Sequence, residues 1–101
     1  MKIPKKVKIG IREFDVELVD GINNSGTPHI SSDLGELSHD ALKIRISNRF
    51  SEFIQIETFL HEICHAILSE IEEDKLSENE KLVSLLAKQL YILLTENDFF
   101  K

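Results

Sequence analysis

The sequence predicts an α+β fold for a single domain, with strands in the first half and helices in the second. Residues 5–48 contain stretches in which apolar and polar side chains alternate, which is typical of half-buried strands. From residue 51 onward, apolar residues recur at every third or fourth position, the spacing of an amphipathic helix. A length of 101 residues, with 42% hydrophobic and 30% charged residues, indicates one folded domain. We therefore expect an antiparallel sheet of about three or four strands packed against helices.

The strand-forming half divides into two segments and a loop. In residues 6–20, KVKIGIREFDVELVD, Gly10 interrupts the alternation, which predicts two short strands or one bent strand. Residues 21–35 are rich in Gly, Asn and Ser and are expected to form a loop. Residues 42–47, LKIRIS, alternate again, and SHDA before them is predicted to turn a hairpin. This last strand could pair with an extended peptide if it lies at an edge of the sheet, or it could be interior.

The second half predicts two helices, at about 51–71 and 78–96, separated by the polar stretch EEDKLSENE. The apolar stripes that predict them are Phe53, Ile56, Leu60, Ile63, Cys64, Ile67 and Ile71, and then Leu82, Val83, Leu86, Leu90 and Leu94. Cys64 lies on the first stripe, so we expect it to be a small buried side chain and not a metal ligand or redox group.

Charge and composition exclude several classes of function. A net charge of −6 and a pI near 5.1 argue against nucleic-acid binding. One cysteine cannot form an internal disulfide, which suits a reducing compartment such as the cytoplasm. No apolar run of signal-peptide length follows the basic start MKIPKK, and none is long enough to cross a bilayer. We expect a cytoplasmic protein without membrane or nucleic-acid partners.

The stretch LHEICHAIL, residues 60–68, places an HExxH motif inside the first predicted helix. His61 and His65 are four residues apart, so one helix face can aim both imidazoles at a zinc ion about 2.0–2.1 Å away. Glu62 is one position round the helix, where its carboxylate can act as a general base beside the metal. The alternative is that the histidines are ordinary residues of a polar helix face and the motif is accidental. The spacing favours a Zn²⁺ site.

A catalytic zinc site normally has three protein ligands and an open position, so a third ligand is needed. The metzincin extension is excluded because Leu68 and Ile71 stand where Gly and His would be required. An acidic ligand from the start of the second helix remains, and Glu80 is the preferred candidate. The alternative ligands are Glu78, Glu73 and Glu70. Glu80 could instead belong to a capping box in which Ser77 caps the second helix.

HEICH followed by NEKLV resembles the gluzincin arrangement, in which a glutamate preceded by asparagine on a following helix completes the site. The strands and the ending NEKLVSLLAKQLYILLTEND are similar to small phage and prophage-type zincin-like proteins, related to ImmA/IrrE-type metallopeptidases. This resemblance covers nearly the whole chain. It implies that His61, His65 and Glu80 bind zinc, that Glu62 is the general base, and that a regulatory protein in a bacterial or phage-infected cell is the target. Only residues 66–79 separate His65 from Glu80, which leaves no room for a second catalytic lobe.

The resulting expectation is a minimal zinc metallopeptidase that hydrolyses peptide bonds in a protein or peptide substrate. Candidates for stabilising the oxyanion are His29, His39, Arg45, Arg49 and Tyr91, of which Tyr91 is disfavoured by its position on the second helix. The alternative from another class is a non-catalytic binding module with a zincin-like shape, in which zinc is structural or absent. The sequence does not predict the oligomeric state.

Overall fold

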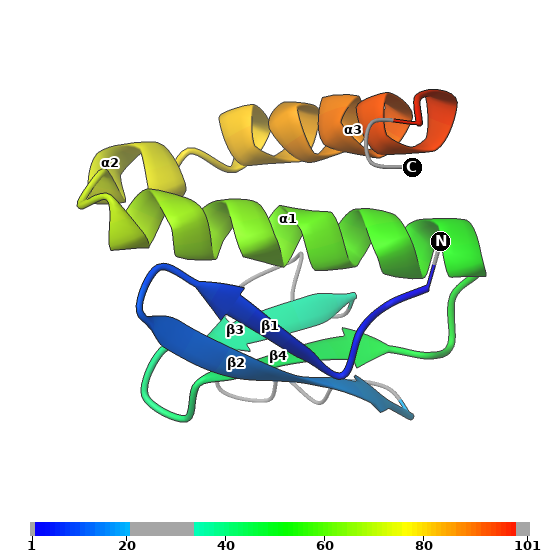
Figure 1. Cartoon of the computed structure of the whole chain (residues 1–101), viewed down its shortest axis with the longest axis horizontal. Helices are drawn as coiled ribbons and strands as arrows, with labels where there is room; N and C mark the ends of the chain where they lie inside the picture. The colour runs from blue at the N-terminus through cyan, green and yellow to red at the C-terminus, as the bar shows by residue number, and fades with distance from the viewer. Residues whose placement is uncertain (1, 21–33, 99–101) are drawn as a thin grey trace.

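Residues 2–20 and 34–98 are described in the computed structural model of the chain, and they form a sheet and a layer of helices (Figure 1). The elements are β1 (Lys6–Ile9), β2 (Arg12–Val19), β3 (Gly35–Ser38), β4 (Lys43–Ser47), α1 (Glu52–Glu70), α2 (Asp74–Ser77) and α3 (Glu80–Glu96). Helix α1 lies across one face of the sheet, and α3 lies on the far side of α1. The predicted α+β class is confirmed, with strands first and helices second.

The sheet is mixed, so the expectation of an antiparallel sheet is wrong. Its order is β1-β2-β4-β3, and β2 pairs with β4 in parallel while the two outer pairs are antiparallel. The reason lies in β4, whose Ile44 and Ile46 are fully buried and therefore require an inner position. The hairpin then places β3 at the edge. The idea that residues 42–47 form a peptide-binding edge is consequently wrong as well.

Of the two alternatives at Gly10, two short strands is the correct one, and the predicted hairpin turn at SHDA is confirmed. Gly10, with a φ of 62°, lies in the turn between β1 and β2, where a left-handed backbone favours glycine. Ile11 follows it and is 86% exposed, so the alternation does not run through this turn. In the second hairpin the backbone N–H of Ala41 donates to Ser38 Oγ at 3.2 Å. Leu42 belongs to this turn, with a φ of 53°, and not to the strand predicted to include it.

The helices begin close to the predicted positions. Ser51 caps α1 by accepting from the N–H of Ile54 at 3.4 Å. The short helix α2 was not predicted, and it turns the chain back so that α3 runs along α1 (Figure 1). Asn79 caps α3 by accepting from the N–H of Leu82 at 3.1 Å. The alternative in which Ser77 caps this helix is therefore wrong, and Glu80 stands at the first helical position.

Helix α1 is buried on two sides. Toward the sheet it contributes Phe59 and Ala66 to a cluster with the inner strands. Toward α3 a second cluster forms, and the burial of Cys64 in it confirms the expected core role; its members are Ile56, Leu60, Cys64, Val83 and Ala87. This double packing holds the HEICH segment in place. None of the helices in the described part of the chain could cross a membrane.

Candidate metal centre

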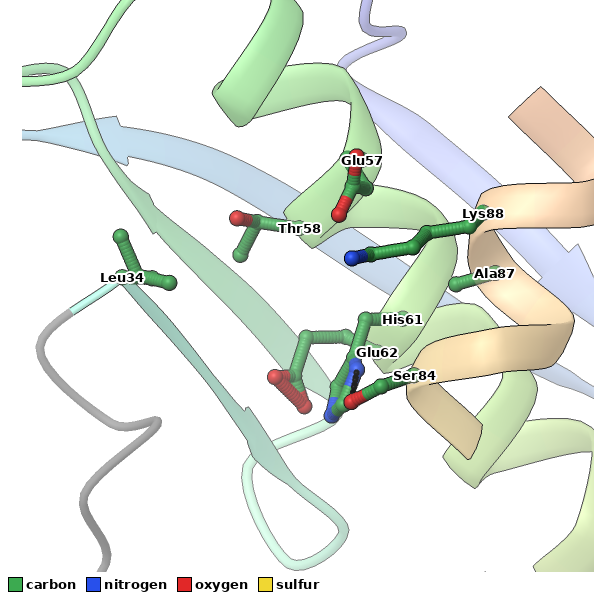
Figure 2. A pocket seen from close by; sticks show the side chains of 8 residues that line it. All are labelled: Leu34, Glu57, Thr58, His61, Glu62, Ser84, Ala87 and Lys88. Carbon is green, nitrogen blue, oxygen red and sulfur yellow. Dashed lines mark hydrogen bonds between the residues drawn. The ribbon is translucent and has the colours of Figure 1, made fainter. Parts of the chain in front are cut away.

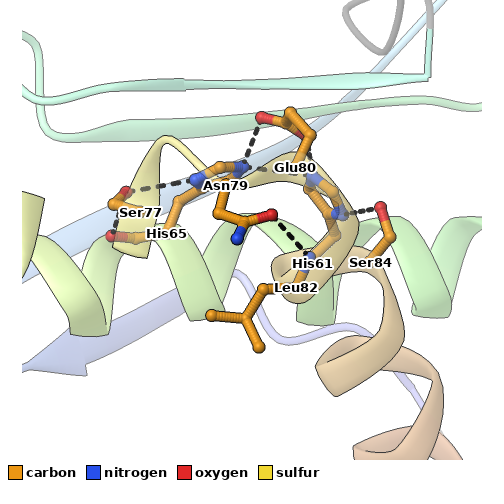
Figure 3. Close-up of polar contacts among 7 residues, drawn as sticks. All are labelled: His61, His65, Ser77, Asn79, Glu80, Leu82 and Ser84. Atoms are coloured by element: carbon orange, nitrogen blue, oxygen red, sulfur yellow. Dashed lines mark hydrogen bonds and ion pairs between the residues drawn. The ribbon is translucent and has the colours of Figure 1, made fainter. Parts of the chain in front are cut away.

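The two histidines of HEICH point to the same place. His61 and His65 lie one turn apart on α1 and are largely shielded from solvent, with side chains 14% and 15% exposed. Their Nε2 atoms are 3.1 Å apart. Each ring is thereby aimed at the end of α3 that carries Glu80 (Figure 3).

Glu80 joins both histidines from the first turn of α3. Its Oε2 lies 3.0 Å from His61 Nε2, and its Oε1 lies 3.0 Å from His65 Nε2 (Figure 3). Asn79 supplies the helix cap, so the Glu80 carboxylate is available for this contact. Within the described residues, these three side chains form the one group of three that could hold a metal ion. The structure thus brings together the three residues that the sequence selected as ligands.

The spacing of these atoms is compatible with a bound metal ion. Two ligands at 2.0–2.1 Å from zinc, separated by a tetrahedral angle, lie about 3.3 Å apart. The two Nε2 atoms are 3.1 Å apart, slightly closer than this, and each lies 3.0 Å from a different oxygen of Glu80. With one ligand atom from each residue, the three atoms lie within 4.8 Å of one another, so a modest rearrangement would admit an ion. Two imidazoles and one carboxylate are also the donor set of one type of catalytic zinc site.

Two serines lie within hydrogen-bonding distance of the Nδ1 atoms of the histidines. Ser77 Oγ donates to the His65 carbonyl at 3.3 Å and lies 3.2 Å from His65 Nδ1. Because its one hydrogen points to the carbonyl, Ser77 accepts from Nδ1–H, and the neutral ring keeps its lone pair on Nε2. Ser84 Oγ lies 3.4 Å from His61 Nδ1, within hydrogen-bonding distance. Partners of this kind orient metal-binding histidines.

The protonation state expected for His61 is also the one that a metal ligand requires. Burial lowers the pKa of His61, the neighbouring His65 lowers it further, and Glu80 opposes both effects. A lowered pKa keeps the imidazole neutral near neutral pH. Metal ions bind the neutral form, so less free energy is spent on removing a proton.

Glu62 lies beside the three ligands without being one of them. It is 7% exposed, and its side chain points into a cavity next to His61 (Figure 2). Burial raises the pKa of Glu62 to about 8, with smaller contributions from the charges of Glu80 and Glu36. At neutral pH this pKa leaves the Glu62 carboxyl mostly protonated in the metal-free protein. A metal ion at the three ligands would lower the pKa of Glu62, because a nearby positive charge favours the carboxylate that can accept a proton.

The cavity has a volume of about 190 Å³ and opens between α1, α3 and the residue that precedes β3. Its lining is shown in Figure 2 and comprises Leu34, Glu57, Thr58, His61, Glu62, Ser84, Ala87 and Lys88. Ser84 and Lys88 were not singled out from the sequence. They follow Glu80 by four and eight residues, so the helical period placed all three on one face of α3.

The other predicted site residues lie elsewhere. Glu70 forms an ion pair with Arg12 at 3.0 Å, while Glu73 and Glu78 are exposed at the ends of α2. Among the oxyanion candidates, His29 lies outside the described residues. None of the other candidates lines the cavity. His39 is exposed in a turn, and Tyr91 packs on Phe53. The two arginines form ion pairs: Arg45 with Glu17 and Glu36, and Arg49 with Asp20. Lys88 is the described cation that lines the cavity.

Comparison with known proteins adds no relative. No family model matches the chain, and neither the curated proteins nor the solved structures contain a significant match.

Proposed function

We propose that the chain is a zinc-dependent peptidase that uses His61, His65 and Glu80 as metal ligands. The observation that carries this proposal is the position of Glu80, whose two oxygens each lie 3.0 Å from a histidine Nε2 although 14 residues (66–79) separate it from His65. The donor set leaves room for the fourth, open position that catalysis requires.

Each side chain has a distinct part in this chemistry. Zinc held by three protein ligands polarises a carbonyl group and lowers the pKa of water toward about 7. Glu62 accepts the proton of the attacking water on a carboxylate oxygen and returns it to the leaving nitrogen. Ser77 and Ser84 keep the imidazole rings in the ligand orientation. Lys88, which lines the same cavity, is the described group best placed to meet negative charge on the substrate.

The substrate of this proposal is a protein or peptide chain. The resemblance of HEICH and NEKLV to the gluzincin arrangement supports the same class of reaction, and the resemblance of the strands and the C-terminal segment to phage and prophage-type zincins supports a bacterial or phage origin. The competing function is a binding module in which zinc only stabilises the fold. A buried carboxylate beside the ligands favours the peptidase, because a structural site has no need of a general base.

The test is the substitution Glu62→Gln, which keeps the size of the side chain but cannot accept the proton. The variant should bind zinc and fold as the wild type does, and it should lose peptidase activity by a factor of 100 or more, roughly the contribution of a general base. Cleavage of unfolded proteins and of peptide libraries, followed by mass spectrometry, measures this activity.

Glu52→Gln is the matched control, because it removes the same charge from the exposed first turn of α1, away from the cavity. It should cleave as the wild type does. Equal cleavage by wild type and Glu62→Gln would contradict the role of Glu62. Zinc binding without any cleavage across a broad peptide library would favour the binding module.

A further inference from the structure

The face of α3 that points away from α1 is built from large apolar side chains. Five of them are between 38% and 53% exposed: Leu82, Leu85, Leu86, Ile92 and Leu93. On its opposite face, Val83 and Ala87 are buried against α1. A helix that is apolar on both faces is normally covered on both. In Figure 1, α3 is the outermost layer, and no described segment lies over its outer face.

The outer face follows the spacing of a helix–helix seam. Residues 82, 85, 89, 92 and 96 are separated alternately by three and four positions, which is the a/d pattern of a heptad repeat. Leu86 and Leu93 lie next to this row and widen it. Gln89 is the polar residue in the middle of the row, and Glu96 ends it. Such a row is suited to pack against another helix of the same character.

The charges at the two ends of α3 favour a second copy of the chain, packed in the antiparallel direction. Lys81 stands at the beginning of the helix, next to Leu82, and Glu96 is the last residue of the row; both are exposed. An antiparallel second copy would bring Lys81 of each chain near Glu96 of the other, so the contact forms twice. The two Gln89 amides would meet near the two-fold axis, where each can donate to the other. Antiparallel helix dipoles are favourable as well.

We infer that the chain forms a homodimer in which the outer faces of two α3 helices pack antiparallel. Helix α3 has 17 residues, so the shared seam is about 25 Å long. The metal centre stays accessible, because Glu80 and Ser84 are on the side of α3 that meets α1 and Lys88 points into the cavity (Figures 2 and 3). This inference does not depend on the proposed peptidase activity.

Sedimentation equilibrium of the full chain from about 1 to 200 µM tests the dimer. Wild type should be dimeric at the upper end of this range. Leu85→Glu should weaken the dimer by more than about 100-fold, because each subunit would bury an unpaired charge. Leu18→Glu is the matched control, since Leu18 is 51% exposed on β2 and Leu85 is 53% exposed. It should dimerise as the wild type does, and circular dichroism should show that both variants fold.

A charge reversal tests the antiparallel direction. Lys81→Glu should weaken the dimer by roughly 10-fold because it faces Glu96 of the second copy twice. Adding Glu96→Lys in the same chain should restore the wild-type affinity. A wild type that stays monomeric up to 200 µM would overturn the inference. A dimer that is insensitive to Leu85→Glu would place the interface elsewhere.

Discussion

At the scale of single residues, the contact that decides the site is between Glu80 and the two histidines. Without an ion, three groups with lone pairs 3.0 to 3.1 Å apart must share protons to avoid repulsion. With a metal ion among them, the same groups would become its ligands. The geometry therefore links the affinity for zinc directly to the charge on Glu80.

We expect Glu80→Gln to weaken zinc binding by more than about 100-fold, since loss of a mere supporting group costs 10- to 100-fold. The helix should persist, because Asn79 and not Glu80 provides its cap. Competition titration with a chromophoric chelator measures the affinity. Glu78→Gln is the control, as Glu78 is exposed two residues earlier and outside the group of ligands. Equal affinities of wild type and Glu80→Gln would remove Glu80 from the metal centre.

The second prediction concerns Glu62 and the pH dependence of the stability of the metal-free protein. Its pKa is raised from 4.5 to about 8 by burial, so the folded state keeps a proton that the unfolded state loses above pH 4.5. The free energy of unfolding should therefore fall as the pH rises from about 4.5 to about 8 and then level off. The fall is on the order of 5 kcal/mol.

Urea unfolding in the presence of a chelator, repeated from pH 5 to pH 8, measures this dependence. Glu62→Gln cannot ionise, so its curve should be flatter than that of wild type, and the variant should be the more stable protein at pH 8. Parallel curves for the two proteins would mean that Glu62 is ionised in the folded state.

At the scale of elements, the approach of β3 to α1 shapes the cavity. Gly35 begins β3, and a Cβ atom there would lie 2.5 Å from Thr58 Cγ2 and 3.1 Å from the Arg45 carbonyl oxygen. Gly35→Ala must therefore push the strand and the helix apart. We expect a loss of about 1–3 kcal/mol in the free energy of unfolding, the usual cost of overpacking.

Thr58→Ser provides the matched partner, because serine lacks the methyl group with which the new Cβ collides. In a double-mutant cycle, Gly35→Ala combined with Thr58→Ser should lose clearly less than the sum of the single losses. Additive losses, measured by urea unfolding, would show that the contact between β3 and α1 is not the constraint.

The helices, strands and site residues could be predicted only where they depend on residues close together in the sequence. The HEICH ligands required one helix, and its period alone put His61 and His65 on a shared face. Glu80 was selectable because it stands at the start of the second predicted helix, which a short turn could bring back beside the first. Its capping alternative could be decided only once Asn79 was seen to cap α3. Ser77 depended on the unpredicted helix α2, whose four residues carry no strong periodic signal.

At the scale of the whole molecule, the fold class followed from the order of periodicities, but the strand order did not. Alternation in residues 42–47 is the same whether the strand pairs in parallel or antiparallel, and the pairing with β2 joins segments far apart in the chain. The apolar stripes also predicted more burial than occurs, since Phe53, Ile67 and Ile71 are 43% to 59% exposed. An apolar stripe shows which face of a helix is hydrophobic. Whether that face is buried depends on the neighbouring elements or on a second subunit.

In the proposed metal centre, one ion would join two helices. Helix α1 supplies His61 and His65, and α3 supplies Glu80, at the end of the helix pair where α2 makes the turn (Figure 1). Zinc content is therefore the most direct measurement of the central claim. After reconstitution and gel filtration, elemental analysis should find about one zinc per wild-type chain and almost none in the double variant His61→Ala/His65→Ala. A wild type without zinc, or a double variant that keeps it, would contradict the metal centre.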